Sequence, residues 1–282
     1  MSLSVGVVIT SFNQGDMIRE AVESVLGQSR AAEELIVVDD GSGVGASEVL
    51  DALGQRGVRL LRQRNLGVST ARNSGFAELH TDCVAVLDGD DRYAETFLEA
   101  TMAVLEEDPD VVGCSSWLRM FGVTDAIVRP AGGRLVDFLH RNACPAAAVI
   151  RRGVWEEAGG YEESMRGGFE DWDFFLSVLE PGGRIDVVRQ PLIDYRTSPQ
   201  SANIASMEHR LELYGQLIDR HLGAFTGNLR SVVLAHESAS TERATRWERL
   251  LLADRGLDVG EVTYGDGGMA AAVRIATARR PR

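Results

Sequence analysis

The chain has 282 residues, of which 44% are hydrophobic and 25% charged, as in ordinary globular proteins with a sizeable core. Its formal net charge of −13 argues against a nucleic acid as partner, because phosphate backbones require a basic surface. All 29 basic residues are arginine. A phosphate would therefore have to be bound by arginine, by backbone N–H groups or by a metal ion.

The three cysteines, Cys83, Cys114 and Cys144, are widely spaced and form no CxxC pair. Their odd number argues against a disulfide framework and suits a reducing cytosol. We see no signal peptide before the first apolar run, and no run reaches the ~18 apolar residues of a membrane-spanning helix. We therefore expect a cytoplasmic protein, and we leave open a peripheral association with a membrane.

The first part of the chain alternates apolar runs with helical patterns. Strands buried on both faces are predicted over residues 4–10, 34–42, 58–63 and 83–91. Helices are predicted between them over residues 17–29, 45–55 and 67–79, with caps at Ser47 and at Ser69 or Thr70. This alternation indicates a parallel α/β sheet, whose ligands bind at the carboxyl ends of the strands.

The second part of the chain is less regular. Further strands are predicted over residues 110–121 and 184–196. Helices are predicted over residues 94–108, 134–142, 151–161, 169–183 and 207–225. After a soft boundary near residue 226, a strand-like run, a helix and a hairpin across Gly-Asp-Gly-Gly predict a small α+β appendage.

Acidic residues gather at the predicted ends of two strands, with Asp39 and Asp40 after the second and Asp88, Asp90 and Asp91 after the fourth. The pair Asp39-Asp40 is also compatible with a simple turn before a glycine. The second group fits a solvated turn, a pair of hydrolytic carboxylates, or a site for a hard cation such as Mg²⁺ or Mn²⁺. Concentrated negative charge in an already acidic chain favours the cation.

Five segments occur in order: TSFNQGDMIREAVESVLGQS, LIVVDDGS, NLGVSTARNSGF, VAVLDGDD and GGYEESMRGGFEDWDFFLSV. Together they closely resemble the family-2 inverting glycosyltransferases over about residues 3 to 200. The resemblance implies a GT-A fold, which is a Rossmann-like, mostly parallel sheet flanked by helices. It also implies direct transfer of a sugar from a nucleoside-diphosphate sugar, UDP-linked by preference, to an acceptor hydroxyl.

The resemblance implies roles for the donor side. Thr10, Phe12, Asp39 and Asp40 would contact the base or ribose, with Phe12 stacking on the ring and Asp40 accepting from its N–H. The alternative for Phe12 is a place in the core.

The resemblance also implies which residues contact the diphosphate and the metal ion. Arg72 would face the diphosphate from the start of a helix, unless it is a surface arginine packed on the sheet. Asp88 would lie near the ribose. Asp90 and Asp91 would bind the Mn²⁺ or Mg²⁺ that carries the diphosphate.

Glu170 and Asp171 match the family's acidic pair on the acceptor side. Asp171 would take the proton of the acceptor hydroxyl, and Glu170 would orient the acceptor. Asp173 would lie on a different face of the helix. The alternative is a helix N-terminus in which acids merely complement the dipole.

Two departures from the family refine the expectation. The Gln-x-x-Arg-Trp motif of processive members has no match after the base, so we expect a non-processive enzyme. Many relatives carry a histidine shortly after Tyr-Arg, but here Ser198 follows, and His209 is the nearest histidine. A third protein ligand for the metal is therefore in doubt.

The expected organisation is a catalytic domain over residues 1–225 and an appendage of unknown role over 226–282. About residues 1–110 would bind the nucleotide-sugar, and about 111–225 would face a carbohydrate or glycolipid acceptor in polysaccharide or glycoconjugate synthesis. A homodimer is left open. The rival functions are an inactive sugar-binding protein on the same fold and a nucleotidyltransferase, although the lysine-containing phosphate loop of the latter is absent.

Overall fold

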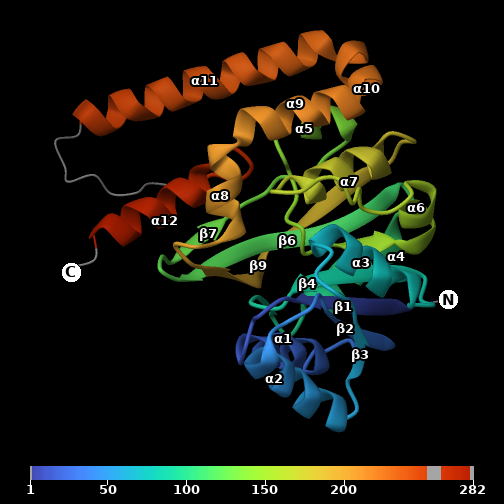
Figure 1. Ribbon diagram of the computed structural model, residues 1–282. Helices are drawn as coiled ribbons and strands as arrows, with labels where there is room; N and C mark the ends of the chain where they lie inside the picture. Colours follow the sequence, from blue (N-terminus) through green and yellow to red (C-terminus); the bar gives the residue numbers. More distant parts are fainter. Residues whose placement is uncertain (1, 253–261, 280–282) are drawn as a thin grey trace.

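The computed structural model describes residues 2–252 and 262–279, in which nine strands form one sheet through the middle of the molecule (Figure 1). The strand order is β3-β2-β1-β4-β8-β6-β9-β5, and β7 pairs with β6. Apolar side chains pack against both faces of this sheet: Val7 and Ile9 belong to one buried cluster, and Val8 belongs to the other. The sheet is therefore the central layer between two cores.

The N-terminal half is the parallel part of the sheet. Its strands are β1 (Val5–Ser11), β2 (Glu34–Asp39), β3 (Arg59–Arg62) and β4 (Cys83–Asp88). The connecting helices are α1 (Met17–Leu26), α2 (Val44–Gln55) and α3 (Val68–Ala77). All three pairings among these strands are parallel, which confirms the predicted alternation.

The predicted helix caps are wrong. α2 and α3 begin earlier, after Gly43 and Gly67, so Ser47 and Ser69 lie inside the helices. Gly67 has a φ of +98°, a left-handed conformation that favours glycine. The glycines thus supply the non-helical backbone that we had assigned to the hydroxyl residues.

The central part of the chain adds the mixed half of the sheet. Its strands are β5 (Arg92–Tyr93), β6 (Val111–Gly122), β7 (Ala126–Val128), β8 (Val149–Arg151) and β9 (Arg184–Thr197). Its helices are α4 (Phe97–Glu107), α5 (Leu135–Phe138), α6 (Arg152–Glu157) and α7 (Glu170–Leu179). β8 is antiparallel to both β4 and β6, whereas β6 and β9 run parallel. The short strands β5, β7 and β8 escaped prediction because they hold too few residues for a pattern.

Helices make up most of the described C-terminal part of the chain. Its helices are α8 (Ala202–Glu208), α9 (Arg210–Arg220), α10 (Leu222–Gly227), α11 (Leu229–Leu252) and α12 (Gly268–Arg279). Instead of the single helix predicted over residues 207–225, the chain bends at His209 and His221. The strand predicted just after residue 226 is wrong, because most of that run lies in α11. The predicted hairpin falls partly on residues 253–261, which lie outside the described residues, and its remainder forms a loop and α12. In Figure 1, α12 returns beside α8.

A close contact between α3 and β1 fixes how this helix lies on the parallel part of the sheet. A Cβ atom added to Gly75 would lie 2.5 Å from Cγ1 of Val8, so α3 packs directly on β1. In the sheet, Thr10 is paired with Asp88. The start of α3 and the carboxyl ends of β1 and β4 therefore meet at one edge, where ligands of parallel sheets bind.

Candidate active site

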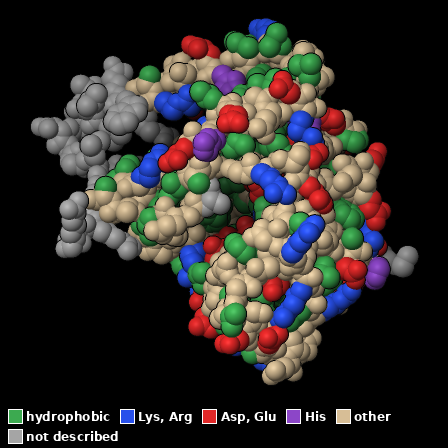
Figure 2. All heavy atoms as spheres, in the orientation of Figure 1, with side chains coloured by type: hydrophobic (Ala, Val, Ile, Leu, Met, Phe, Trp, Pro, Cys, Tyr) green, Lys and Arg blue, Asp and Glu red, His purple; other side chains and the backbone are tan. Residues whose placement is uncertain are grey.

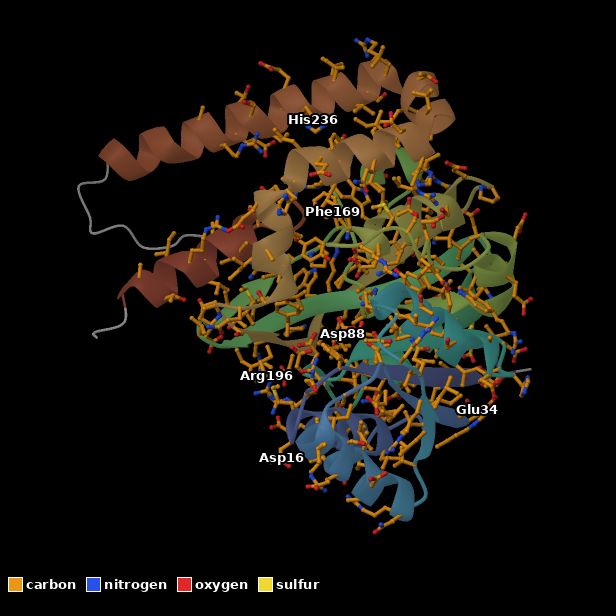
Figure 3. All side chains as sticks on the ribbon, viewed as in Figure 1. Asp16, Glu34, Asp88, Phe169, Arg196 and His236 are labelled. Carbon is orange, nitrogen blue, oxygen red and sulfur yellow. The ribbon has the colours of Figure 1, made fainter. Side chains whose placement is uncertain are left out.

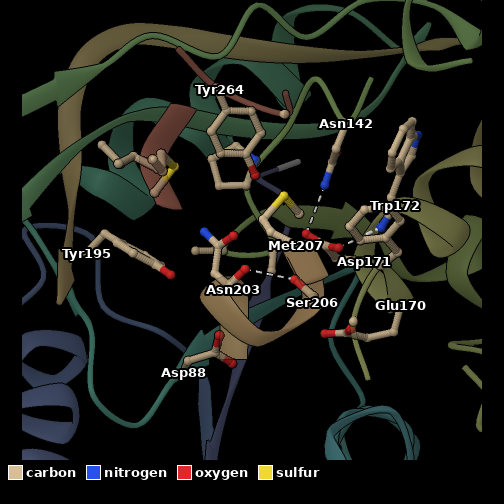
Figure 4. A pocket seen from close by; sticks show the side chains of 18 of the residues that line it. Asp88, Asn142, Glu170, Asp171, Trp172, Tyr195, Asn203, Ser206, Met207 and Tyr264 are labelled. Atoms are coloured by element: carbon tan, nitrogen blue, oxygen red, sulfur yellow. Dashed lines mark hydrogen bonds between the residues drawn. The ribbon is translucent and has the colours of Figure 1, made fainter. Parts of the chain in front are cut away.

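A pocket of about 220 Å³ opens at the carboxyl edge of the parallel strands. It forms a hollow near the middle of the face shown in Figure 2. Its polar lining comprises Arg72, Asp88, Asp91, Asn142, Glu170, Asp171, Asn203, Ser206 and Arg210. Aromatic and sulfur-containing side chains complete the wall, among them Trp172, Tyr195, Met207, Tyr264 and Met269 (Figure 4). The pocket thus combines carboxylates with the flat apolar surfaces that suit a sugar ring.

Arg72 joins the two sides of this pocket. Its side chain is only 2% exposed, and its Nη2 and Nη1 atoms lie 3.0 Å from Asp88 and 3.1 Å from Glu170. Its guanidinium group also lies over the ring of Tyr161. The alternative of a surface arginine is therefore wrong. One buried cation connects the end of β4 to the start of α7 and offsets part of the charge of the two acids.

Asp171 is held by two hydrogen bonds. Its Oδ1 accepts from the backbone N–H of Trp172 (2.8 Å), and its Oδ2 accepts from Nδ2 of Asn142 (2.9 Å). Burial in the pocket wall and the neighbouring Glu170 raise the pKa of Asp171 to about 7, although Arg72 and the hydrogen bonds act in the opposite direction. A carboxylate with a pKa near 7 can act as a proton acceptor at neutral pH.

The backbone immediately before α7, the helix that carries Glu170 and Asp171, is strained. Phe169 has a φ of +66°, a left-handed conformation that is uncommon for a bulky residue. Its ring lies 5.2 Å from that of Trp172, and Figure 3 shows it between Asp88 and the C-terminal helices. Packing of this ring therefore fixes the point at which α7 begins, and with it the positions of Glu170 and Asp171.

Asp173 faces away from the pocket, as the helical spacing predicts. It is 1% exposed and accepts from Nε of Arg220 (2.7 Å). His221 lies beside it, with Nε2 3.0 Å from Oδ1 of Asp173. This carboxylate therefore belongs to a buried ion cluster between α7 and the C-terminal helices.

The acids after β4 repel one another. Burial and Asp88 raise the pKa of Asp90 to about 6, and burial and Asp90 raise the pKa of Asp91 well above its usual range. Asp91 accepts from the backbone N–H of Arg196 (2.7 Å). The hydroxyl of Thr10 donates to Asp88 (3.2 Å), which keeps the ends of β1 and β4 together.

These residues fit a hard cation, since they offer crowded carboxylate oxygens, and burial together with the neighbouring acids raises the pKa of Asp90 and of Asp91. Within residues 2–252 and 262–279, no three acidic, histidine or cysteine side chains converge into a complete ligand set. Mg²⁺ commonly takes only one or two protein carboxylates and completes its shell with phosphate and water. His209 is 67% exposed, and its Nδ1 lies 3.9 Å from Oε2 of Glu212.

On the nucleotide side, Phe12 is 46% exposed, so its alternative place in the core is wrong. Asp39 accepts from the backbone N–H of Ser42 (2.9 Å). This bond forms the simple turn that the sequence allowed as the alternative for Asp39-Asp40. The oxygens of Asp40 accept from Leu66 N (2.8 Å) and Gly67 N (2.9 Å). Both acids therefore shape loops in this structure, and their contacts with a base remain predictions.

Several lining residues had no signal in the sequence. Asn142 lies in a loop without a motif, and Asn203 and Ser206 lie on α8, which we had not predicted. Tyr264 was expected in a hairpin, yet its hydroxyl donates to the carbonyl of Cys144 (2.9 Å). The C-terminal segment, which the sequence left as an appendage of unknown role, thus contributes to the pocket wall.

Similarity to known proteins agrees with this geometry. The sequence profile of glycosyl transferase family 2 matches residues 6–157, more than half of the chain. The chain belongs to glycosyl transferase family 2. This confirms the family expected from the five motifs.

Individual relatives match only part of their length. The uncharacterized glycosyltransferase YibD of Escherichia coli is 37% identical over 113 residues, which is 39% of this chain and 33% of YibD. The succinoglycan biosynthesis protein ExoO of Rhizobium meliloti is 30% identical over 199 residues, 64% of this chain and 57% of ExoO. The family-2 chain described here thus spans less than two thirds of either relative.

A solved structure shares the fold. The crystal structure of S. aureus TarS 1–349 in complex with UDP superposes with a TM-score of 0.59 and 15% identity, covering 80% of this chain and 74% of that one. The expected GT-A architecture of a mostly parallel sheet flanked by helices is therefore confirmed. Across the described residues, no helix is both long and apolar enough to span a bilayer.

Proposed function

We propose that the protein is a metal-dependent, inverting, non-processive glycosyltransferase that uses a nucleoside-diphosphate sugar, with UDP as the preferred nucleotide. Family membership, the UDP complex of TarS and the succinoglycan role of ExoO support this proposal. The acceptor would be a hydroxyl of a carbohydrate or glycolipid in polysaccharide or glycoconjugate synthesis. The observation that carries the proposal is one pocket in which Arg72 connects the strand-end acid Asp88 to the acceptor-side acids beside Asp171.

On the donor side, Asp90 and Asp91 would hold Mn²⁺ or Mg²⁺, which when bound would neutralise charge that develops on the leaving diphosphate. Asp88 is held by Arg72 and Thr10, so its orientation toward the ribose is set before the donor arrives. Phe12 presents an exposed ring at the end of β1, where it would stack on the base.

On the acceptor side, Asp171 would accept the proton of the attacking hydroxyl. The oxygen then attacks the anomeric carbon as the bond to the diphosphate breaks, with inversion and without a covalent sugar–enzyme intermediate. Glu170 is held by Arg72, and its charge keeps the pKa of Asp171 high enough for proton transfer near neutrality. Tyr195 lines the pocket and offers a flat surface for the acceptor ring, whereas Trp172 is only 1% exposed and packs against Phe169 and Tyr214.

Calorimetric binding of UDP tests the donor side. We expect binding with Mn²⁺ or Mg²⁺ and much weaker binding with a chelator, and Asp90→Asn should remove most of the metal-dependent part. Asp16→Asn is the matched control, because it makes the same charge change on a side chain that is 88% exposed and away from the pocket (Figure 3). UDP binding of equal strength in chelator would contradict the proposed metal site.

Asp171→Asn tests the acceptor side. General-base catalysis contributes ~10²–10⁴-fold, so transfer to an acceptor should fall by that factor while donor affinity stays nearly unchanged. A comparable loss of donor affinity would mean that Asp171 serves the sugar or the metal. Donor binding without turnover of any nucleotide-sugar by the unaltered protein would favour an inactive binding protein instead.

A further inference from the structure

We infer that Asn142 is a positioning residue for Asp171, and that the turn over residues 262–268 holds Asn142 in place. The turn lies outside residues 6–157, which match the family, and its contribution could not be expected from the motifs. The assignment rests on the function proposed above, in which Asp171 accepts the acceptor proton.

Both polar atoms of the Asn142 side-chain amide make hydrogen bonds. Its Nδ2 donates to Oδ2 of Asp171 (2.9 Å), and its Oδ1 accepts from the backbone N–H of Cys144 (3.3 Å). The second bond sets the orientation of the amide, so that the donor faces Asp171 (Figure 4). Asn142 is 8% exposed and comes from the loop between α5 and β8, so it reaches Asp171 from an element other than α7.

The C-terminal turn packs on the backbone of Asn142. Gly265 has a φ of +76°, and a Cβ atom there would lie 2.1 Å from the carbonyl oxygen of Asn142. Asp266 closes the turn by accepting from the hydroxyl of Thr263 (2.7 Å) and from the N–H of Gly268 (3.0 Å). No side chain fits at Gly265, so the turn contacts the backbone of Asn142 directly there, and a cavity of about 160 Å³ lies beside this contact.

Two further hydrogen bonds attach the turn to its surroundings. Tyr264 donates its hydroxyl to the carbonyl of Cys144 (2.9 Å), and Nη2 of Arg210 donates to the carbonyl of Gly265 (2.9 Å). The turn therefore contacts the loop at two points, the carbonyl groups of Asn142 and Cys144, and is itself attached to α9 through Arg210. A displacement of the turn would move the amide that contacts Asp171.

This contact affects the proton affinity of Asp171. The titratable groups around that carboxylate are Glu170 on its own helix, Arg72 on α3, Tyr161, Cys144 and Tyr264. Burial and Glu170 favour the protonated form, whereas the Asn142 hydrogen bond favours the charged form and lowers the pKa. Asn142 thus directs Asp171 and keeps it available as a base over more of the neutral range.

The pH dependence of transfer from a UDP-sugar tests the contact. Asn142→Leu keeps a similar size but removes the donor, so the midpoint of the acid limb should rise by about one pH unit. Asn203→Leu is the matched control: Asn203 lines the same pocket and makes no hydrogen bond to Asp171 in the described structure. An unmoved midpoint in a folded Asn142→Leu protein would overturn the inference, and so would an equal rise in Asn203→Leu.

The turn has its own test. Gly265→Ala should also raise the midpoint of the acid limb of transfer, because the new Cβ pushes against the carbonyl of Asn142. Gly267→Ala is the control, since its φ of +94° is equally unfavourable but its Cβ would meet the sulfur of Met207 at 3.3 Å instead. The double variant Gly265→Ala/Asn142→Leu should shift the midpoint of the acid limb no further than Asn142→Leu alone. Additive shifts, or equal shifts in both glycine variants, would remove the turn from the assignment.

A readout independent of transfer separates this inference from the proposed function. In protein labelled with ¹³C-aspartate, the Asp171 carboxyl signal can be assigned by its loss in Asp171→Asn and then titrated by NMR. Asn142→Leu should raise its titration midpoint by the same amount as in the kinetics. If Asp171→Asn retains full transfer, the proposed base is wrong, yet this titration still reports whether Asn142 acts on Asp171.

Discussion

Asp171→Asn should gain stability relative to the unaltered protein as the pH rises, while it removes transfer. The pKa of Asp171 is raised from its ordinary value of 3.8 to about 7, so the folded state binds this proton more tightly than the unfolded state does. The charged form of Asp171 therefore lowers the free energy of unfolding. This loss is absent below about pH 4, grows as the pH rises, and is complete above about pH 7. At ~1.36 kcal/mol per pH unit it reaches at most ~4 kcal/mol, and less where water enters the pocket.

Urea unfolding at pH 5 and pH 8.5 measures this effect. A neutral asparagine carries no such penalty, so the advantage of the variant over the unaltered protein should be larger at pH 8.5. Asp173→Asn makes the same change two residues away but should destabilise by ~3–5 kcal/mol, because Arg220 and His221 lose their buried partner. An equal difference at both pH values, or a loss in Asp171→Asn like that in Asp173→Asn, would refute the reasoning.

Three other changes have expected outcomes. Phe12→Ala should weaken UDP binding by ~1–3 kcal/mol in calorimetry and leave the melting temperature nearly unchanged, because the ring is 46% exposed. Arg72→Met should lower the free energy of unfolding by ~3–5 kcal/mol in urea titration, since two carboxylates lose their buried cation, and Arg72→Lys should restore only part of it; a loss under 1 kcal/mol would contradict this. Gly75→Ala should destabilise by ~1–3 kcal/mol through overpacking against β1, and unchanged thermal unfolding would show that α3 can move aside.

The parallel half of the fold could be predicted because β1, β2 and β4 are continuous apolar runs. β3 is an exposed to half-buried edge strand, so its predicted burial on both faces is wrong. The C-terminal part could not, since a run such as Val232, Val233 and Leu234 looks like a strand. Of these three residues of α11, only Val232 is buried, while Val233 and Leu234 are 56% and 50% exposed. A short β-branched run does not reveal whether one or both of its faces will be covered.

The acids of the site were visible in the sequence because they follow strands or begin a helix in a family pattern. Their connections were not visible. The ion pair between Arg72 and Glu170 joins residues that are 98 positions apart, and the contact of Tyr264 with Cys144 joins residues 120 apart. Such contacts depend on how whole elements pack, which no local periodicity encodes.

The turn over residues 262–268 also bears on the order in which the molecule is assembled during translation. It is synthesised about 90 residues after Asp171, and N-terminal regions of a chain generally fold first as it emerges from the ribosome. The parallel sheet with Phe12 and Asp88 can thus be in place while one wall of the pocket is still missing. A stalled or cleaved chain would carry the strand-end acids beside an open pocket, with the loop that carries Asn142 not yet held by the turn.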